Sequence, residues 1–117
     1  MGLAYPGPML SYRSLSVVTT GATAVTSKSD IYRYYVYNAS AGVRYLKIYD
    51  KATAPTTSDA PIETWPIPSG GGANASSDSP LLSLTAGLAL RASTGVADSD
   101  AGAPAANDVV VNFGYRV

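Results

Sequence analysis

The sequence has no cysteine and no histidine among its 117 residues. Without cysteine, the chain can form no disulfide framework and offers no thiolate for chemistry. Histidine is the side chain most often used as a general base and as a metal ligand, so its absence removes the usual material for both roles. We therefore expect no catalytic residue, no metal site and no cofactor, and we expect that the protein is not an enzyme.

Charge is also scarce. Eight basic and eight acidic residues cancel, and charged residues make up 14% of the chain, against about 25% in average soluble domains. There is no basic excess of the kind that nucleic-acid-binding proteins carry. No apolar run approaches the roughly 20 residues that span a bilayer. The opening "MGLAYPGPML" has no cationic segment of the secretory type. We expect no nucleic-acid or membrane partner, synthesis in a reducing cytoplasm, and a surface that favours contact with other protein.

The first twelve residues differ from the rest. Pro6 and Pro8 exclude a helix and favour an extended conformation. Apolar side chains such as Leu3, Tyr5 and Met9 are unusual for a purely solvated tail. Two readings stay open for residues 1–12: a frayed terminus, or an extended arm that orders on a neighbour. Residues 13–117 are expected to form one domain.

The domain reads as a series of short strands. Turn signals recur about every ten residues, which is typical of an antiparallel sandwich. Residues 80–92 have some leucines at helical spacing, but Gly87 favours two strands with a bend. We predict an all-β, jelly-roll-like antiparallel β-sandwich of seven or eight strands, with an exposed loop over 69–80 and another over 95–108. The expected strands cover 14–20, 22–27, 30–38, 43–50, 62–68 (an edge strand, because of its prolines), 81–94 as two pieces, and 109–117.

Residues 30–38 and 43–50 are expected to form a hairpin across the turn "NASAG". In "VRYLKIYD", Leu46 and Ile48 alternate with Tyr45, Lys47 and Tyr49, so the two sets point to opposite faces. The leucine and isoleucine should face the core. The full set of residues expected inside is Val17, Ile31, Val36, Leu46, Ile48, Leu82, Leu84, Leu88, Leu90, Val109 and Val111.

The tyrosines are the most prominent constellation. Six of the nine lie on the two strands of the expected hairpin. Tyrosine gives a large, rigid contact area with a polar tip, which suits protein interfaces. Two alternatives are cross-strand packing within the chain and binding of a ligand such as a sugar. The residues expected at an interface are Tyr5, Met9, Tyr12, Tyr35, Tyr37, Tyr45, Tyr49 and Trp65.

Carboxylates offer little chemistry. Asp98 and Asp100 in "ADSDAG" resemble the start of a calcium loop, but the EF-hand spacing fails, and Asp, Ser and Gly are ordinary turn residues. An ion there stays an open alternative. Glu63 is the one glutamate and lies in an expected edge strand, where a charge discourages aggregation.

Several phrases together resemble a small structural protein of tailed bacteriophages. They are "YLKIYDKATAP", "PIETWPIP" with "SGGG", and "GLALRASTGVADSDAGAPAANDVVVNFGY", and they cover about residues 43–115. The chain departs from the pattern at Trp65-Pro66 and in its Pro-rich start.

The resemblance implies a virion component such as a capsid decoration (cement) protein or a head-fibre part. It would bind the major capsid protein and itself, with a trimer at a three-fold position as the implied oligomer. The alternative is a carbohydrate- or receptor-binding module of a head or tail appendage, which would use the tyrosines and Trp65.

Overall fold

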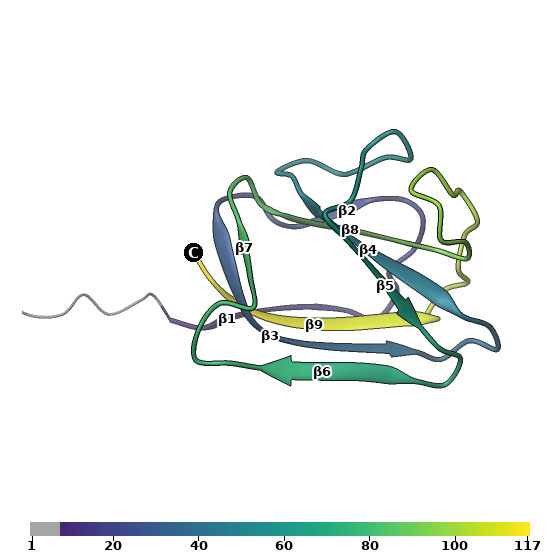
Figure 1. Ribbon diagram of the computed structural model, residues 1–117, viewed down its shortest axis with the longest axis horizontal. Helices are drawn as coiled ribbons and strands as arrows, with labels where there is room; N and C mark the ends of the chain where they lie inside the picture. Colours follow the sequence, from purple (N-terminus) through teal and green to yellow (C-terminus); the bar gives the residue numbers. More distant parts are fainter. Residues whose placement is uncertain (1–7) are drawn as a thin grey trace, which may run out of the picture.

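The computed structural model describes residues 8–117, which form an antiparallel β-sandwich of nine strands (Figure 1). The predicted fold class is confirmed, with nine strands against the seven or eight expected. The strands are β1 (Leu10–Ser14), β2 (Ala22–Val25), β3 (Ser29–Asn38), β4 (Arg44–Asp50), β5 (Glu63–Ile67), β6 (Gly72–Ser76), β7 (Leu82–Leu84), β8 (Leu88–Ser93) and β9 (Val109–Arg116).

The strands divide into two sheets. Sheet A has the order β1-β9-β3-β6, with β7 also pairing with β3, and sheet B has the order β2-β8-β4-β5. In the described part of the chain, β4 and β5 are the one pair of consecutive strands that are hydrogen-bonded to each other. The chain therefore passes repeatedly from one sheet to the other, and it leaves β5 and β6 at neighbouring edges of the two sheets (Figure 1).

The prediction of a hairpin between residues 30–38 and 43–50 is wrong. β3 belongs to sheet A and β4 to sheet B, so the turn between them is a crossover. Asn38, which is fully buried, holds this crossover: its side-chain Nδ2 donates to the carbonyls of Gly42 at 2.8 Å and Ile67 at 2.9 Å. Its Oδ1 accepts from the N–H and the hydroxyl of Ser40. A side-chain network thus replaces the ladder that a hairpin would form.

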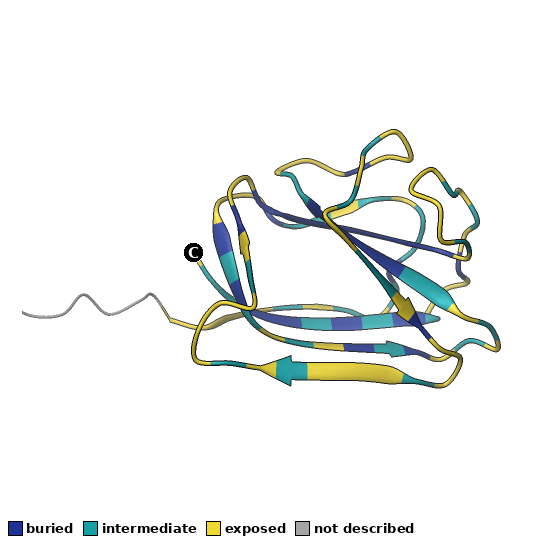
Figure 2. Cartoon of the chain, in the orientation of Figure 1, coloured by how far each residue is buried: buried dark blue, intermediate teal, exposed yellow. Residues whose placement is uncertain are grey.

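The core lies between the sheets and matches the residues expected there. Ten of the eleven predicted residues are buried, and Leu82 is half-buried against the same cluster. β8 is buried on both faces, whereas most of β6 is exposed (Figure 2). The bend at Gly87 is also confirmed, because β7 ends before it and β8 begins after it.

Three local predictions differ from the structure. Residues 10–12, expected in the arm, form part of β1 and pair with β9, so the sandwich begins at Leu10 rather than at residue 13. The region 14–20 is mostly irregular instead of a strand. The loop expected over 69–80 contains β6, which pairs with β3 along its whole length. Small residues at β6 allow this close approach: a Cβ on Gly72 would overlap the carbonyl oxygen of Val36.

Candidate functional site

The outer face of sheet B is covered by the chain itself. Lys47 and Arg91 lie directly opposite each other on β4 and β8, and both are fully buried. Tyr49 is 1% exposed, and its hydroxyl accepts a hydrogen bond from Nε of Arg91 at 3.1 Å. The expectation that Tyr49 faces another protein is therefore wrong in this fold. The segment 94–102 and the stretch before β2 supply the cover.

Backbone carbonyl groups of the covering segment accept hydrogen bonds from the two buried cationic side chains. The guanidinium group of Arg91 donates to the carbonyls of Asp98 at 3.3 Å and Asp100 at 3.2 Å. Nζ of Lys47 donates to the carbonyl of Ala97. Burial lowers the pKa of Lys47 from its usual value, and the positive charge of Arg91 lowers it further, while the nearby aspartates act in the opposite direction. The cluster is a structural clamp on the loop.

The Asp98–Asp100 loop uses its own oxygen atoms internally. The carboxylate of Asp100 accepts from the N–H groups of Gly95 at 3.2 Å and Gly102 at 2.8 Å. The carbonyls of both aspartates accept from Arg91. One carboxylate oxygen of Asp100 and the backbone carbonyls of both aspartates are thus engaged by donors of the chain itself. Within residues 8–117, no group of three or more acidic side chains is placed to hold a metal ion.

The outer face of sheet A, in contrast, is open. Side chains of directly paired residues lie on the same face of a sheet. The register puts the row Asp30–Arg116, with one charge of each sign, at one end of this outer surface. The three rows beyond it form the surface that we call the A-face. Its rows are Ser11–Gly114–Arg33–Ser76, then Arg13–Asn112–Tyr35–Asn74, then Val110–Tyr37–Gly72.

Tyr35 is the most exposed aromatic side chain of the A-face, at 42%. It stands between Asn112 and Asn74, and the three residues line a shallow hollow of about 240 Å³ together with Arg33. Arg33 lies across Gly114, where a Cβ would fall 2.5 Å from its Nε, and reaches the hydroxyl of Ser11 at 3.3 Å. The three rows contain two guanidinium groups and no carboxylate. The A-face is thus a flat, weakly basic surface with aromatic rings at its centre.

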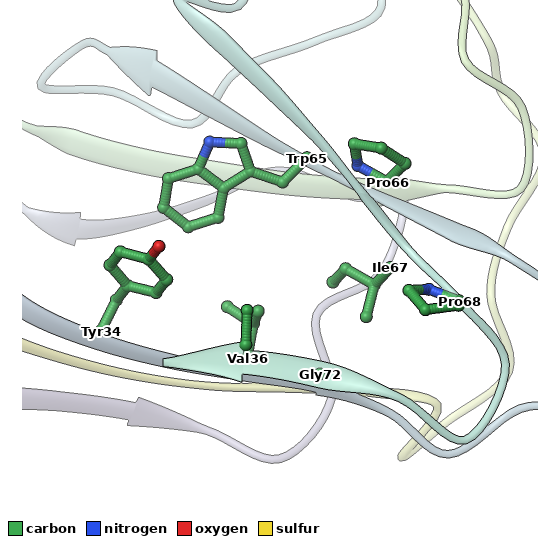
Figure 3. Close-up of a pocket in the computed structure, with 8 residues that line it drawn as sticks. Tyr34, Val36, Trp65, Pro66, Ile67, Pro68 and Gly72 are labelled. Atoms are coloured by element: carbon green, nitrogen blue, oxygen red, sulfur yellow. The ribbon is translucent and has the colours of Figure 1, made fainter. Parts of the chain in front are cut away.

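A second candidate surface opens between the edges of the two sheets. Trp65 on β5 points toward Tyr34 on β3, with their ring centroids 4.7 Å apart (Figure 3). On one side of this pair, a hollow of about 220 Å³ extends between β5 and β6, and a second one of about 240 Å³ lies on the other side. We call the two hollows together the edge cleft. Its walls carry one charged side chain, Glu63, whose carboxylate accepts from Nε1 of Trp65 at 3.1 Å.

The structure distributes the residues expected at an interface over several surfaces. Tyr35 and Tyr37 share the A-face. Tyr12 packs partly against the core, and Trp65 lines the edge cleft. Tyr45 is half-buried on the outer side of sheet B, and Met9 is 36% exposed before β1. Tyr5 lies outside the described residues. The predicted set is therefore not one continuous patch.

Sequence reasoning missed the polar partners of the tyrosines. The sequence predicts an exposed loop around Asn74 and a closing strand around Asn112, with no site at either residue. The alternation in "VVVNFGY" does place Asn112 opposite to Val111 and Phe113, so a polar outer face could have been read from it. The position of Asn74 beside Tyr35 depends on the pairing of β6 with β3, for which the sequence carries no local signal.

No helix in residues 8–117 is long and apolar enough to cross a membrane. Comparison with known proteins gives no match to a family model, a curated protein or a solved structure.

Proposed function

We propose that the chain is a non-enzymatic structural protein of a tailed-phage particle. In this proposal it binds the major capsid protein through the A-face, and it stabilises or decorates the capsid as a symmetric oligomer. The phage assignment is supported by the sequence phrases between residues 43 and 115 that resemble such proteins. The proposal includes the trimer that this resemblance implies.

The observation that supports the proposal most is the asymmetry between the two outer faces. The corresponding face of sheet B is closed by the chain's own loop, whereas the A-face leaves Tyr35 and Tyr37 accessible. Tyrosine and arginine are enriched in protein interfaces, and lysine and glutamate are depleted. A flat surface with two tyrosines, two arginines and no carboxylate suits a polar or mildly acidic protein surface.

The test is binding to bare capsids of the phage that encodes the chain. We would compare the parent with a Tyr35→Ser/Tyr37→Ser variant, and use Tyr45→Ser as the matched control on the other sheet. The proposal expects the double variant to lose at least about tenfold in affinity, as hot-spot aromatics do, while the control binds like the parent. Equal binding by all three proteins would contradict a role for the A-face.

Copy number is the second measurement. A decoration protein is expected at hundreds of copies per purified particle, because it follows the symmetry of the shell. A few copies per particle would instead favour an appendage.

The hollow beside Tyr35 favours a second candidate, a carbohydrate-binding module. An exposed aromatic ring flanked by the amides of Asn74 and Asn112 offers both stacking and hydrogen bonds to a sugar. Calorimetric titration with cell-surface glycans of the host distinguishes the two candidates. Saturable binding that Asn112→Ala abolishes would support the module, and capsid binding without glycan binding would support the structural role.

A further inference from the structure

The β6 edge of sheet A is free. Residues 71, 73, 75 and 77 direct their backbone groups to β3, because Gly71 accepts from the N–H of Asn38 and Ser77 donates to the carbonyl of Tyr32. The alternate residues direct theirs away from β3: Gly72, Asn74 and Ser76. In the described part of the chain, β6 has no strand on that side. An unpaired edge of this kind is a template for another strand.

The edges of sheet B are protected against such pairing, and the β6 edge is not. The segment that forms β5 contains Pro66 and continues into Pro68, and proline lacks the N–H that a new ladder would need. β2 is four residues long and has an irregular register between Thr23 and Val25. β6 reads "GANAS", with neither proline nor charge.

The edge cleft lies beside this free edge. Ala73 and Ala75 of β6 line its two hollows, so the inward side chains of a strand added to β6 would stand next to them. Each hollow exceeds the roughly 150 Å³ of an apolar cavity that holds a benzene ring. Trp65, which separates the hollows, is half-buried. An added strand with apolar side chains on one face would cover the indole ring.

The chain contains a segment with this pattern. Residues 1–5 read "MGLAY", in which Met1, Leu3 and Tyr5 alternate with Gly2 and Ala4. This period of two gives one large apolar face and one small face in an extended strand. The next residue is a proline, which would end the ladder. No side chain in residues 1–9 is charged, which matches the apolar walls of the cleft.

We propose that residues 1–5 of a second copy of this chain add to the β6 edge as a strand, with Leu3 and Tyr5 entering the edge cleft on either side of Trp65. The inference deepens the self-association that the proposed function includes, since it names the segment and the surface that join two copies. It also gives the Pro-containing arm a partner. The strand exchange makes a heterologous contact, which closes into a ring at a suitable rotation.

The reach of the chain favours a second copy over the chain's own cleft. The arm leaves sheet A at β1, and a strand beyond β6 would stand four strand spacings away. At about 4.8 Å per spacing, that is roughly 19 Å through the sheet, and more around it. The five steps from Tyr5 to Leu10 span at most about 18 Å when fully extended. The arm is therefore too short to pair with its own β6.

The first test is molecular mass in solution, measured by light scattering without any capsid present. Asn74→Pro removes an N–H that points away from β3 and puts a ring in its place, so it blocks the added strand while leaving the β3 ladder intact. Asn74→Ala keeps the N–H and is the matched control. We expect an oligomer for the parent and for Asn74→Ala, and a monomer for Asn74→Pro.

A second variant changes the arm instead of the β6 edge. Leu3→Asp/Tyr5→Asp changes residues outside the described sandwich, so it tests the contact even if the proline variant does not fold. We expect this variant to be a monomer with the melting temperature of a folded protein.

Trp65, the one tryptophan of the chain, gives a direct readout of the cleft. We would add a synthetic peptide of residues 1–9 to the full-length Leu3→Asp/Tyr5→Asp variant and excite tryptophan selectively. The expected result is a saturable blue shift of the emission, which a peptide with the same two aspartates does not produce. A shift of equal size with both peptides would overturn the inference.

A monomeric parent, or an Asp variant with the parental mass, would also overturn the inference. Neither outcome bears on capsid binding by the A-face, because Tyr35 and Tyr37 are not changed. Conversely, loss of capsid binding in the Tyr35→Ser/Tyr37→Ser variant with an unchanged oligomer mass would leave the arm exchange intact. The failures of the two proposals are therefore distinguishable.

Discussion

The phenol oxygen of Tyr49 accepts a hydrogen bond from Nε of Arg91 at 3.1 Å, in a layer between sheet B and the chain's own loop. Both side chains are almost fully buried. A hydrogen bond buried this deeply contributes to the stability of the fold. If either side chain were removed, the polar group of the other would stay buried without a hydrogen-bond partner.

We expect Tyr49→Phe to lower the free energy of unfolding by about 1–2 kcal/mol, because it leaves Nε of Arg91 without an acceptor in a buried site. Urea unfolding is the measurement. Tyr35→Phe, which removes a hydroxyl from an exposed ring, is the control and should stay within about 0.5 kcal/mol of the parent. Identical midpoints for both variants would show that the loop does not seal this layer in solution.

Asn38→Ala should be more damaging. It removes the donor that satisfies the carbonyls of Gly42 and Ile67, and it releases the crossover between the sheets. We expect a loss of about 2–3 kcal/mol, since both hydrogen bonds that this buried amide donates are lost, at about 1–1.5 kcal/mol each. Thermal or chemical unfolding measures it, with the exposed Asn74→Ala as the reference. A loss below about 0.5 kcal/mol would mean that water replaces the amide.

We expect acid to destabilise the protein through protonation of Asp50. Burial raises the pKa of its carboxyl, but the N–H groups of Thr85, Ala86 and Gly87 outweigh burial and hold the pKa below its usual value. Protons therefore bind the unfolded chain more readily than the folded one. The stabilisation is present above the unfolded pKa of about 3.9 and disappears as the pH falls through the lower folded value.

The measurement is the free energy of unfolding between pH 7 and pH 2 for the parent and for Asp50→Asn. At neutral pH the variant should be less stable by about 1–3 kcal/mol, because hydrogen bonds to a charged acceptor are lost. The difference should shrink toward pH 2. A constant difference across this range would contradict the assignment.

Gly87→Ala should destabilise the fold through overlap. A Cβ at this position would overlap the carbonyl oxygen of Val25 and lie 2.9 Å from that of Lys51. Forcing backbone atoms apart at this bend should cost about 1–3 kcal/mol. Gly42→Ala is the matched control, because its Cβ meets the end of the flexible Arg44 side chain instead. Differential scanning calorimetry of both variants checks the prediction, which fails if they melt together.

Much of the fold can be predicted because strands with one buried face repeat every two residues. Leu46 and Ile48 on β4, and Leu88 and Leu90 on β8, follow this period and lie in the core. Gly87 marks the bend between two strands because no side chain fits there. These signals are local, so the sequence contains them.

The pairing of strands and the covering of sheet B by a distant loop do not depend on local sequence. The sequence cannot show that Tyr49 is buried, because the period of two separates the faces of β4 without saying which of them a loop covers. The contact depends on carbonyls of Asp98 and Asp100, about fifty residues away. Similarly, β3 and β4 satisfy every local rule for a hairpin, yet Asn38 directs the chain across to the other sheet.

The candidate site divides in the same way. Exposed tyrosines were predicted, and two of them share the A-face. Asn74 and Asn112, which flank Tyr35, come from strands that meet β3 only after folding. Their roles therefore follow from register rather than from composition.

The position of β9 also sets the order in which the two sheets can be completed. In the described chain, β1 pairs with β9 alone, so it has no sheet A neighbour until residues 109–116 are available, whereas β3 can pair with β6 and β7 before then. Sheet B lacks this constraint, since residue 93 completes it. A chain cut after residue 108 should therefore complete sheet B but leave part of its apolar face uncovered, because β9 and its partner β1 are missing from the opposite sheet. We expect such a chain to aggregate more readily than the full-length protein.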